Sequence, residues 1–168
     1  PFLAAAREAG ARIVGVADTH VHADYISGAP ALAVATGAPY HLHPADSSYA
    51  YDGTPGRLVF EPLEDGGTLR VGRCTLRVRH TPGHTEGSVS FLAGESLAFS
   101  GDFVFVESLG RPDLGDRAAE WAERLWVTLE TARRTWPPDA LVLPAHYASA
   151  RERRADRTVA ARFGDLLA

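Results

Sequence analysis

The sequence predicts an α+β fold in which helices cover layered strands and polar residues gather at the strand ends. Helical and strand patterns alternate at both ends of the chain, whereas residues 58–100 read as successive short strands separated by glycine turns. A chain of 168 residues with 45% apolar and 23% charged residues is also long and apolar enough to bury a core. We therefore expect a single domain over residues 1–168.

The first third of the chain alternates between helix and strand. In order, we expect a helix, a buried strand, a second helix, a short strand and a loop over residues 2–9, 12–17, 27–36, 39–43 and 44–56. Gly10 and Gly37 suit the ends of the two helices, since glycine readily takes the left-handed conformation found there. Ser27 is a candidate cap for the second helix.

The middle of the chain has the pattern of an antiparallel sheet. Strands are expected over residues 58–60, 68–71 and 74–80, followed by a hairpin of residues 88–92 and 97–100 that turns at Gly94. Leu76 and Val78 alternate with Arg77 and Arg79, which indicates a sheet with one wet face. Cys74 falls within this pattern, and we expect it to pack rather than to react.

The last third contains the clearest helical pattern, over residues 116–135, with Asp116 as a candidate cap. Its predicted core positions recur at helical spacing and are Trp121, Ala122, Leu125, Trp126, Leu129 and Ala132. Residues 141–143 read as a short strand. From Arg151 onward, Val159, Phe163 and Leu166 predict a terminal amphipathic helix with a solvated charged face.

Composition narrows the classes of function. The net charge of −4 argues against a nucleic-acid partner, and no apolar run reaches the length of a membrane span. No signal peptide is visible, so we expect a cytoplasmic protein. The abrupt start at Pro1 leaves open a preceding segment. With Cys74 as the single cysteine, an internal disulfide and a cysteine-rich zinc site are excluded.

Histidines and aspartates follow apolar runs at four places in the chain. The residues are His20, His22 and Asp24; then His84 after Pro82 and Gly83; then Asp102 after Gly101; and finally His146 after Pro144. Imidazole and carboxylate together suit zinc, iron and related metals. One such group alone is a weak signal, because surface loops are rich in these residues. Four groups at strand ends predict a shared metal site.

Together these groups resemble the metallo-β-lactamase superfamily, whose pattern is H-x-H-x-D-H followed by a distant His, an Asp and a His. The resemblance runs through nearly the whole chain and implies a four-layer αββα sandwich, with the metal at one edge of two packed sheets. The strands that usually precede the first helix are missing, so we expect a fragment of a longer chain.

Shorter segments resemble persulfide dioxygenases, especially bacterial ones often fused to rhodanese domains. They are THVHAD at 19–24, TPGHTEG at 81–87, GRPDL at 110–114 and PAHY at 144–147. This resemblance implies one Fe(II) per chain, held by His20, His84 and Asp102. It also implies oxidation of a thiol persulfide, of glutathione or a similar thiol, to sulfite and thiol with O₂. No rhodanese domain lies within these 168 residues, and a homodimer stays open.

One position departs from the superfamily pattern. Tyr25 stands where the last His of H-x-H-x-D-H usually helps to bind a second metal. Phenol is a poorer zinc ligand at neutral pH, since its pKa is near 10. The departure therefore favours one metal. In that reading His22, Asp24 and His146 lie at the site and hydrogen-bond water and substrate.

Other polar residues have weaker predictions. Arg111 and Tyr147 are candidates for binding the substrate, because a guanidinium can grip a carboxylate of glutathione. For Arg111, an ion pair at the surface is as well supported as substrate binding. His41 and His43 are expected at the surface or as caps. His80 either orients a ligand or shapes the turn that begins at it.

Two other functions stay open. One is a zinc hydrolase of the glyoxalase II or lactonase type, in which metal-bound water attacks a thioester or lactone. The other is a non-catalytic scaffold or sulfur-carrier module that keeps the fold. Metal identity separates the oxygenase from the hydrolase, and a folded protein that binds no metal would favour the scaffold.

Overall fold

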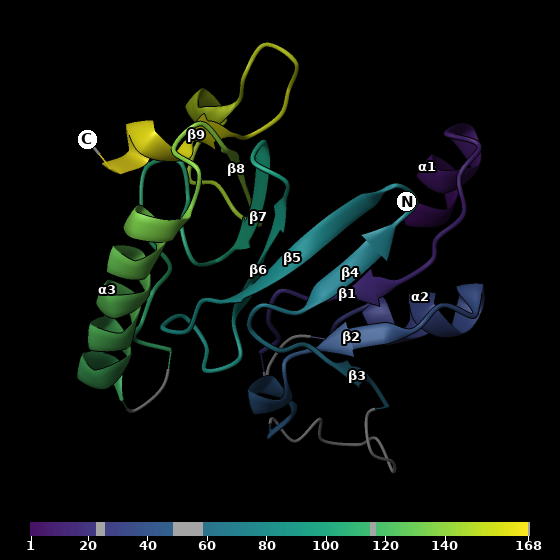
Figure 1. Cartoon of the computed structure of the whole chain (residues 1–168), viewed down its shortest axis with the longest axis horizontal. Coiled ribbons are helices and arrows are strands. Elements are labelled where there is room, and N and C mark those ends of the chain that lie inside the picture. The colour runs from purple at the N-terminus through teal and green to yellow at the C-terminus, as the bar shows by residue number, and fades with distance from the viewer. Residues whose placement is uncertain (23–25, 49–58, 115–116, 168) are drawn as a thin grey trace.

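The computed structural model describes residues 1–22, 26–48, 59–114 and 117–167. Two β-sheets lie face to face, and helices cover their outer faces (Figure 1). This arrangement confirms the expected α+β sandwich. None of the helices in the described ranges is long and apolar enough to cross a membrane.

The smaller sheet is parallel and has the order β1-β2-β3. Its strands are short, with β1 at Val16–Ala17, β2 at Tyr40–Leu42 and β3 at Glu61–Pro62. Helix α2, Ala29–Thr36, packs on this sheet through a cluster that includes Ala29, Ala33, Tyr40 and Leu42. Helix α1, Phe2–Glu8, precedes the sheet and buries no residue.

The larger sheet has the order β4-β5-β6-β7-β8-β9. Its strands are Thr68–Val71, Cys74–His80, Val89–Ala93, Leu97–Gly101, Leu141–Pro144 and Ala161–Arg162. Neighbours are antiparallel except β7 and β8, which run parallel because helix α3, Ala118–Thr135, connects them. Parallel neighbours need such a crossover.

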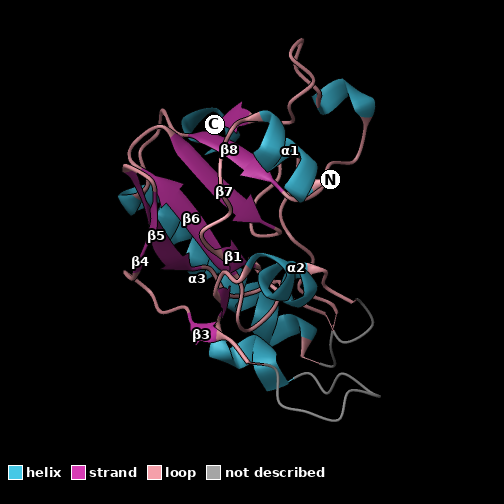
Figure 2. Cartoon of the chain, turned by 90° about the vertical axis from the view of Figure 1, so that its right-hand side faces the viewer, coloured by secondary structure: helices cyan, strands magenta, loops and turns pink. Residues whose placement is uncertain are grey.

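Alternation along β5 and β6 divides the core into two layers. Val78 and Phe91 face the smaller sheet and pack with Leu63, whereas Leu92 faces α3 and packs with Leu129. Successive side chains of a strand point to opposite faces, so each strand serves both layers. Figure 2 looks through the stack of layers, with α2 in front of the sheets and α3 behind them.

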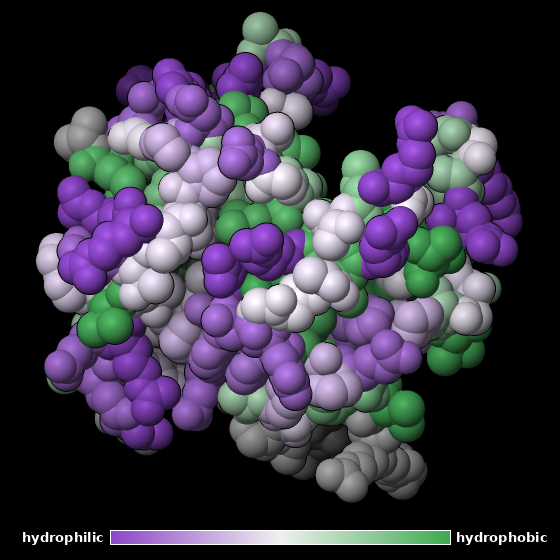
Figure 3. All heavy atoms as spheres, viewed as in Figure 1, coloured by the Kyte–Doolittle hydropathy of each residue, from purple (hydrophilic) through white to green (hydrophobic). Residues whose placement is uncertain are grey.

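The outer face of β4 and β5 is the predicted wet face. Arg77 is exposed and Arg79 is half-buried, in alternation with Leu76 and Val78. Arg70 lies on the same face, because it pairs with Thr75 of β5. The surface on this side is mostly hydrophilic (Figure 3).

Several predicted elements need correction. The terminal helix is absent: residues 150–152 and 163–167 form short 3-10 helices, and Ala161–Arg162 pairs with β8 as strand β9. The strand expected at 12–17 is limited to Val16–Ala17. In the range expected as a strand at 58–60, the described residues 59–60 are not in a strand; β3 lies at Glu61–Pro62, where the chain pairs with β2.

Several single residues also differ from expectation. Cys74 is exposed, since it opens β5 at a turn. Trp126 is 59% exposed and Ala122 is exposed as well, because both lie outside the buried stripe of α3. His41 is buried within β2 rather than at the surface. Helix α2 has Gly28 at its N-cap, although the Ser27 hydroxyl still accepts from the Ala29 N–H.

Candidate metal centre

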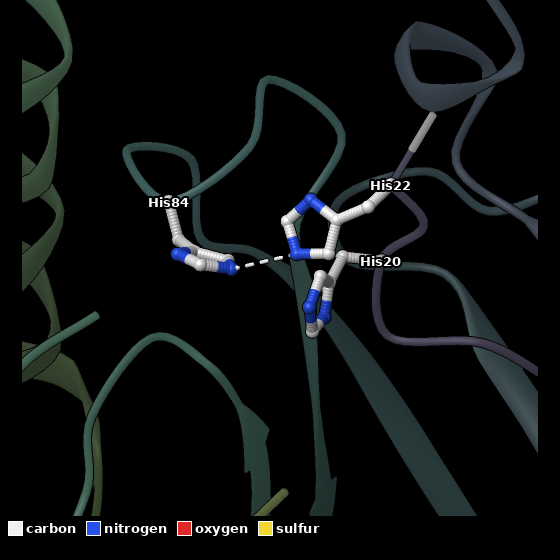
Figure 4. Close-up of side chains that lie close together, drawn as sticks. All are labelled: His20, His22 and His84. Carbon is white, nitrogen blue, oxygen red and sulfur yellow. Dashed lines mark hydrogen bonds between the residues drawn. The ribbon is translucent and has the colours of Figure 1, made fainter. Parts of the chain in front are cut away.

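Three histidines meet at the edge of the two sheets (Figure 4). His20 and His22 follow β1 of the smaller sheet, and His84 lies in the turn between β5 and β6 of the larger one. Each pair of rings has centroids 4.9 Å apart and is nearly perpendicular. One ring nitrogen from each histidine lies within 4.8 Å of the other two. Segments that are distant in the sequence thus supply donors to one point.

Asp102 adds a carboxylate to the same point. It follows β7 and is 7% exposed. Its Oδ2 lies 3.7 Å from Nε2 of His20 and 3.4 Å from Nε2 of His84. His146, which follows β8, donates from Nδ1 to both carboxylate oxygens at 2.7 and 2.9 Å. The carboxylate is therefore held from one side by His146 and faces the buried histidines on the other.

Hydrogen bonding settles which nitrogen of His84 carries its proton. Nδ1 lies 3.0 Å from the Arg111 carbonyl oxygen, and a carbonyl can only accept, so Nδ1 is protonated. In the neutral ring, Nε2 then presents its lone pair to the centre. It lies 3.1 Å from Nε2 of His22. This is the arrangement in which a second partner fixes the ring of a metal-binding histidine.

The imidazoles are held in the neutral form that binds metals. Burial lowers the pKa of His20 to about 4, although Asp102 opposes the shift. Burial also lowers the pKa of His84, against the Arg111 carbonyl and Asp102. At neutral pH these rings therefore offer lone pairs rather than N⁺–H groups, and no ammonium or guanidinium occupies the centre among the described residues.

Two glycines allow close packing of the backbone next to Asp102. Gly101 has a φ of +56°, and a Cβ there would lie 2.6 Å from the Thr19 hydroxyl oxygen. Gly110 lies so close to the Asp102 carbonyl that a Cβ would clash with it outright, at 1.8 Å. Thr19 therefore packs against Gly101, and the Asp102 carbonyl packs against Gly110, at distances that only glycine permits.

The donors fit a transition-metal ion in two overlapping sets. His20, His84 and Asp102 form a two-histidine, one-carboxylate set, which suits iron. His20, His22 and His84 form a three-histidine set, which suits zinc. The two sets share His20 and His84, so one ion near these residues can draw on either.

The two candidates for substrate binding lie at the surface. The Arg111 guanidinium forms an exposed ion pair with Asp113 through two hydrogen bonds. The part of Arg111 that contacts the metal centre is its backbone carbonyl, which accepts from His84. The Tyr147 hydroxyl contacts Arg153, whose guanidinium also lies 4.9 Å from the centre of the Tyr147 ring.

The other candidate residues predicted from the sequence lie away from the three-histidine cluster or outside the described residues. Asp24 and Tyr25 fall outside the described residues. His43 and His80 stack on each other with ring centroids 4.2 Å apart, and His80 donates to the Glu86 carbonyl. His41 faces Glu61 of β3, with Nδ1 and Oε2 3.5 Å apart.

Sequence reasoning missed one buried carboxylate beside the histidines. Asp46 is fully buried in the 3-10 helix Pro44–Ser48 and accepts hydrogen bonds from the segments that carry His22 and His84. The sequence gives it no signal, because an aspartate among proline and serine residues is typical of an exposed turn.

Known proteins are similar to this chain in sequence and in fold. The sequence model of the Metallo-beta-lactamase superfamily matches residues 2–159. The chain is 33% identical over 141 residues to "Persulfide dioxygenase ETHE1, mitochondrial" of Homo sapiens, a match that covers 83% of this chain and 51% of that protein. It is 34% identical over 157 residues to a hydroxyacylglutathione hydrolase of Cereibacter sphaeroides, covering 91% and 56%.

A solved structure agrees with these matches. The crystal structure of ETHE1 from Myxococcus xanthus superposes with a TM-score of 0.77 and 29% identity, over 98% of this chain and 64% of that one. The chain spans about half the length of the curated relatives it matches. It belongs to the metallo-beta-lactamase superfamily, and within that superfamily it resembles the persulfide dioxygenases.

Proposed function

We propose that this chain belongs to a mononuclear non-haem iron dioxygenase that oxidises a low-molecular-weight thiol persulfide to sulfite and thiol. The observation that carries the proposal is the meeting of His20, His84 and Asp102, with both Nε2 atoms within 3.7 Å of one carboxylate oxygen. A two-histidine, one-carboxylate set leaves open positions for a substrate and for oxygen. The 33% identical persulfide dioxygenase supports this choice within the superfamily.

The proposed reaction balances with water as a co-reactant. One persulfide, one O₂ and one water give one thiol, one sulfite dianion and two protons, and the terminal sulfur is oxidised while O₂ is reduced. When bound, Fe(II) would supply the redox chemistry that joins O₂ to this sulfur. The protein holds the two histidine ligands in their neutral state and places the reactants next to each other.

His146 is suited to handle a proton in this reaction. Its Nδ1 hydrogen is held by Asp102, which leaves Nε2 free to accept in the neutral ring. The side chain is 71% exposed, so it can exchange protons with water. Two protons leave per turnover in the balance above, and His146 offers a route from the buried carboxylate to solvent.

Arg111 is the proposed anchor for a carboxylate of the thiol, with glutathione as the candidate. Its present partner Asp113 is half-exposed, and exposed ion pairs contribute little to stability. A substrate carboxylate can therefore replace Asp113 at small cost. Tyr147 lies in the loop after β8, directly after His146, and is proposed as a second contact.

A zinc hydrolase acting on a thioester is the second candidate. The observation that favours it is His22, whose Nε2 lies 3.1 Å from Nε2 of His84 and completes a three-histidine set. Zinc bound in this way lowers the pKa of a bound water to about 7. The 34% identical hydroxyacylglutathione hydrolase supports this alternative.

Metal analysis with paired assays tests the proposal. Protein purified anaerobically should contain about one iron per chain, and it should consume O₂ and release sulfite when given glutathione persulfide. Two zinc ions per chain, with hydrolysis of a hydroxyacylglutathione thioester and no O₂ uptake, would favour the hydrolase. A folded chain that takes up neither metal would favour a scaffold. Cytoplasmic location, a rhodanese partner domain and a homodimer stay predictions for the whole protein.

A further inference from the structure

Asp46 is a buried carboxylate with a complete set of hydrogen-bond donors. It is 0% exposed. Oδ2 accepts from the Val21 N–H at 3.1 Å and from the Thr85 hydroxyl at 3.0 Å, and Oδ1 accepts from the Gly87 N–H at 2.7 Å. A carboxylate buried in this way is expensive unless such bonds compensate it.

The donors belong to the two segments that carry the histidines. Val21 lies between His20 and His22, and Thr85 directly follows His84. Val21 continues from the smaller sheet, whereas Thr85 belongs to the turn of the larger one. One carboxylate group therefore fixes the distance between the two sources of imidazole.

Hydrogen bonds within the turn that carries His84 also hold Thr85 in place. The Thr85 hydroxyl lies 2.7 Å from the Ser88 hydroxyl, which also accepts from the Thr85 N–H at 3.2 Å. A Cβ on Gly87 would lie 2.6 Å from the Asp46 carboxyl carbon, so the turn closes directly on the carboxylate. The turn that carries His84 has little freedom to move relative to Asp46.

Burial makes the charge at Asp46 costly. Burial raises the pKa of this carboxyl, while the three hydrogen bonds and His22 act in the opposite direction. A neutral side chain of similar size would fill the space without this cost, yet it would leave N–H or O–H donors unpaired. The feature that a carboxylate alone supplies here is acceptance at both oxygens, with Oδ2 bonded to both histidine segments and Oδ1 bonded to the Gly87 N–H.

We propose that Asp46 is a positioning residue that sets the separation of His20 and His22 from His84, and so determines metal affinity. Its hydrogen bonds reach backbone and hydroxyl groups rather than the imidazoles, so Asp46 acts through the segments that hold the histidines. The inference rests on the metal centre of the proposed function. Residues that orient metal ligands typically increase metal affinity by about 10- to 100-fold.

Cobalt titration of the metal-free protein tests this role, because Co²⁺ reports both affinity and ligand geometry through its visible absorption. Asp46→Asn preserves the size of the side chain but turns one acceptor into a donor. It should weaken Co²⁺ binding by about 10- to 100-fold and change the absorption bands. Thr85→Val, which removes one of the three bonds, should weaken binding by a smaller factor.

Gly87→Ala tests the same contact from the other side. Its added methyl group would displace the carboxylate without altering Asp46 or a histidine. Val142→Ala is the matched control, since Val142 is fully buried in the α3 layer and away from both histidine segments. It should lower the thermal midpoint while leaving Co²⁺ affinity and absorption as in the parent.

The possible results separate the two proposals. If the parent binds no Co²⁺, the metal centre itself is wrong. If the parent binds Co²⁺ and both Asp46→Asn and Thr85→Val bind within twofold of it, the positioning role is wrong. Equal loss of affinity in Val142→Ala and Asp46→Asn at equal thermal midpoint would also overturn it, because affinity would then follow stability alone. Should Asp46→Asn fail to fold, Thr85→Val decides.

Discussion

At the scale of single residues, Asp102 contacts three histidines in two ways. His146 donates to the carboxylate, whereas Nε2 of His20 and Nε2 of His84 lie 3.7 and 3.4 Å from its Oδ2. The residue types and their order along the chain predict this group. The His84 proton, in contrast, depends on the Arg111 carbonyl 27 residues later, and a contact at that separation leaves no local pattern.

Asp102→Ala should abolish metal binding while the chain still folds. Removing a carboxylate donor should weaken metal affinity at least about 100-fold, more than the loss of an orienting partner. Metal content by mass spectrometry and O₂ consumption measure the effect, and circular dichroism checks the fold. Unfolding of the variant would instead show that Asp102 is needed for structure.

His41→Ala is the histidine control for that experiment. His41 is buried in β2 and faces Glu61, away from the three-histidine cluster. Truncation should cost about 1 to 2 kcal/mol of stability through lost packing. Metal content and turnover should stay near those of the parent, as the sequence already predicts. A large loss of metal at unchanged fold would contradict the assigned ligands.

The metal-free protein should lose stability as the pH falls from 6.5 toward 4. In that window unfolded His20 binds a proton, whereas folded His20, with its pKa lowered to about 4, does not. The unfolded state then holds more protons, so the free energy of unfolding rises with pH by about 1.4 kcal/mol per pH unit for one group. Urea titrations at several pH values measure this slope.

His20→Asn provides the reference for this slope. Asp46 and His84 are present in both proteins, so their contributions largely cancel in the difference. The parent should show the steeper dependence between pH 6.5 and 4. Equal slopes would mean that the folded protein protonates His20 as readily as the unfolded chain does.

At the scale of elements, periodicity predicts what packs locally. The alternation of Leu76 and Val78 with arginines predicts the two faces of β5, and the spacing of Leu125 and Leu129 predicts the buried stripe of α3. The C-terminal segment follows a different rule. Its helical spacing is overridden because residues 161–162 pair with β8, and Phe163 packs in the α3 layer. Strand pairing between distant segments is invisible in a local pattern.

Leu129→Ala and Trp126→Ala should separate buried from exposed positions on α3. Both residues fit the predicted helical core, yet Leu129 is 8% exposed and Trp126 is 59% exposed. The leucine variant should lose about 2 to 5 kcal/mol of stability through lost burial and a cavity. The tryptophan variant should stay within about 0.5 kcal/mol of the parent.

Urea titration measures both free energies of unfolding. The comparison holds the helix and the type of substitution constant, so intrinsic helix propensity contributes little. A larger loss for Trp126→Ala than for Leu129→Ala would mean that the exposed face of α3 is covered in solution.

At the scale of the whole molecule, the superfamily and its layers are predictable because four polar groups occur in a fixed order along the chain. The number of metal ions is harder to predict, since it depends on a single position. Tyr25 replaces the usual histidine, and it lies outside the described residues.

Tyr25→His should raise the number of bound zinc ions from about one to about two. The substitution restores the superfamily pattern, and the new imidazole would join Asp24, Asp102 and His146 as donors. Zinc titration of metal-free protein, followed by calorimetry, gives the count. Tyr25→Phe is the control and should keep the count of the parent. Equal counts in all three proteins would show that Tyr25 does not limit the centre.

The donors of the metal centre come from both sheets, with His20 and His22 on one and His84 and Asp102 on the other. Neither sheet can assemble the centre alone, so an ion bound here acts as a cross-link across the sandwich. Binding then stabilises the docked sheets by RT ln(1 + [metal]/Kd), or about 2.7 kcal/mol at a hundredfold excess over Kd. Molecules that bind the metal would therefore be those in which the two sheets are docked correctly.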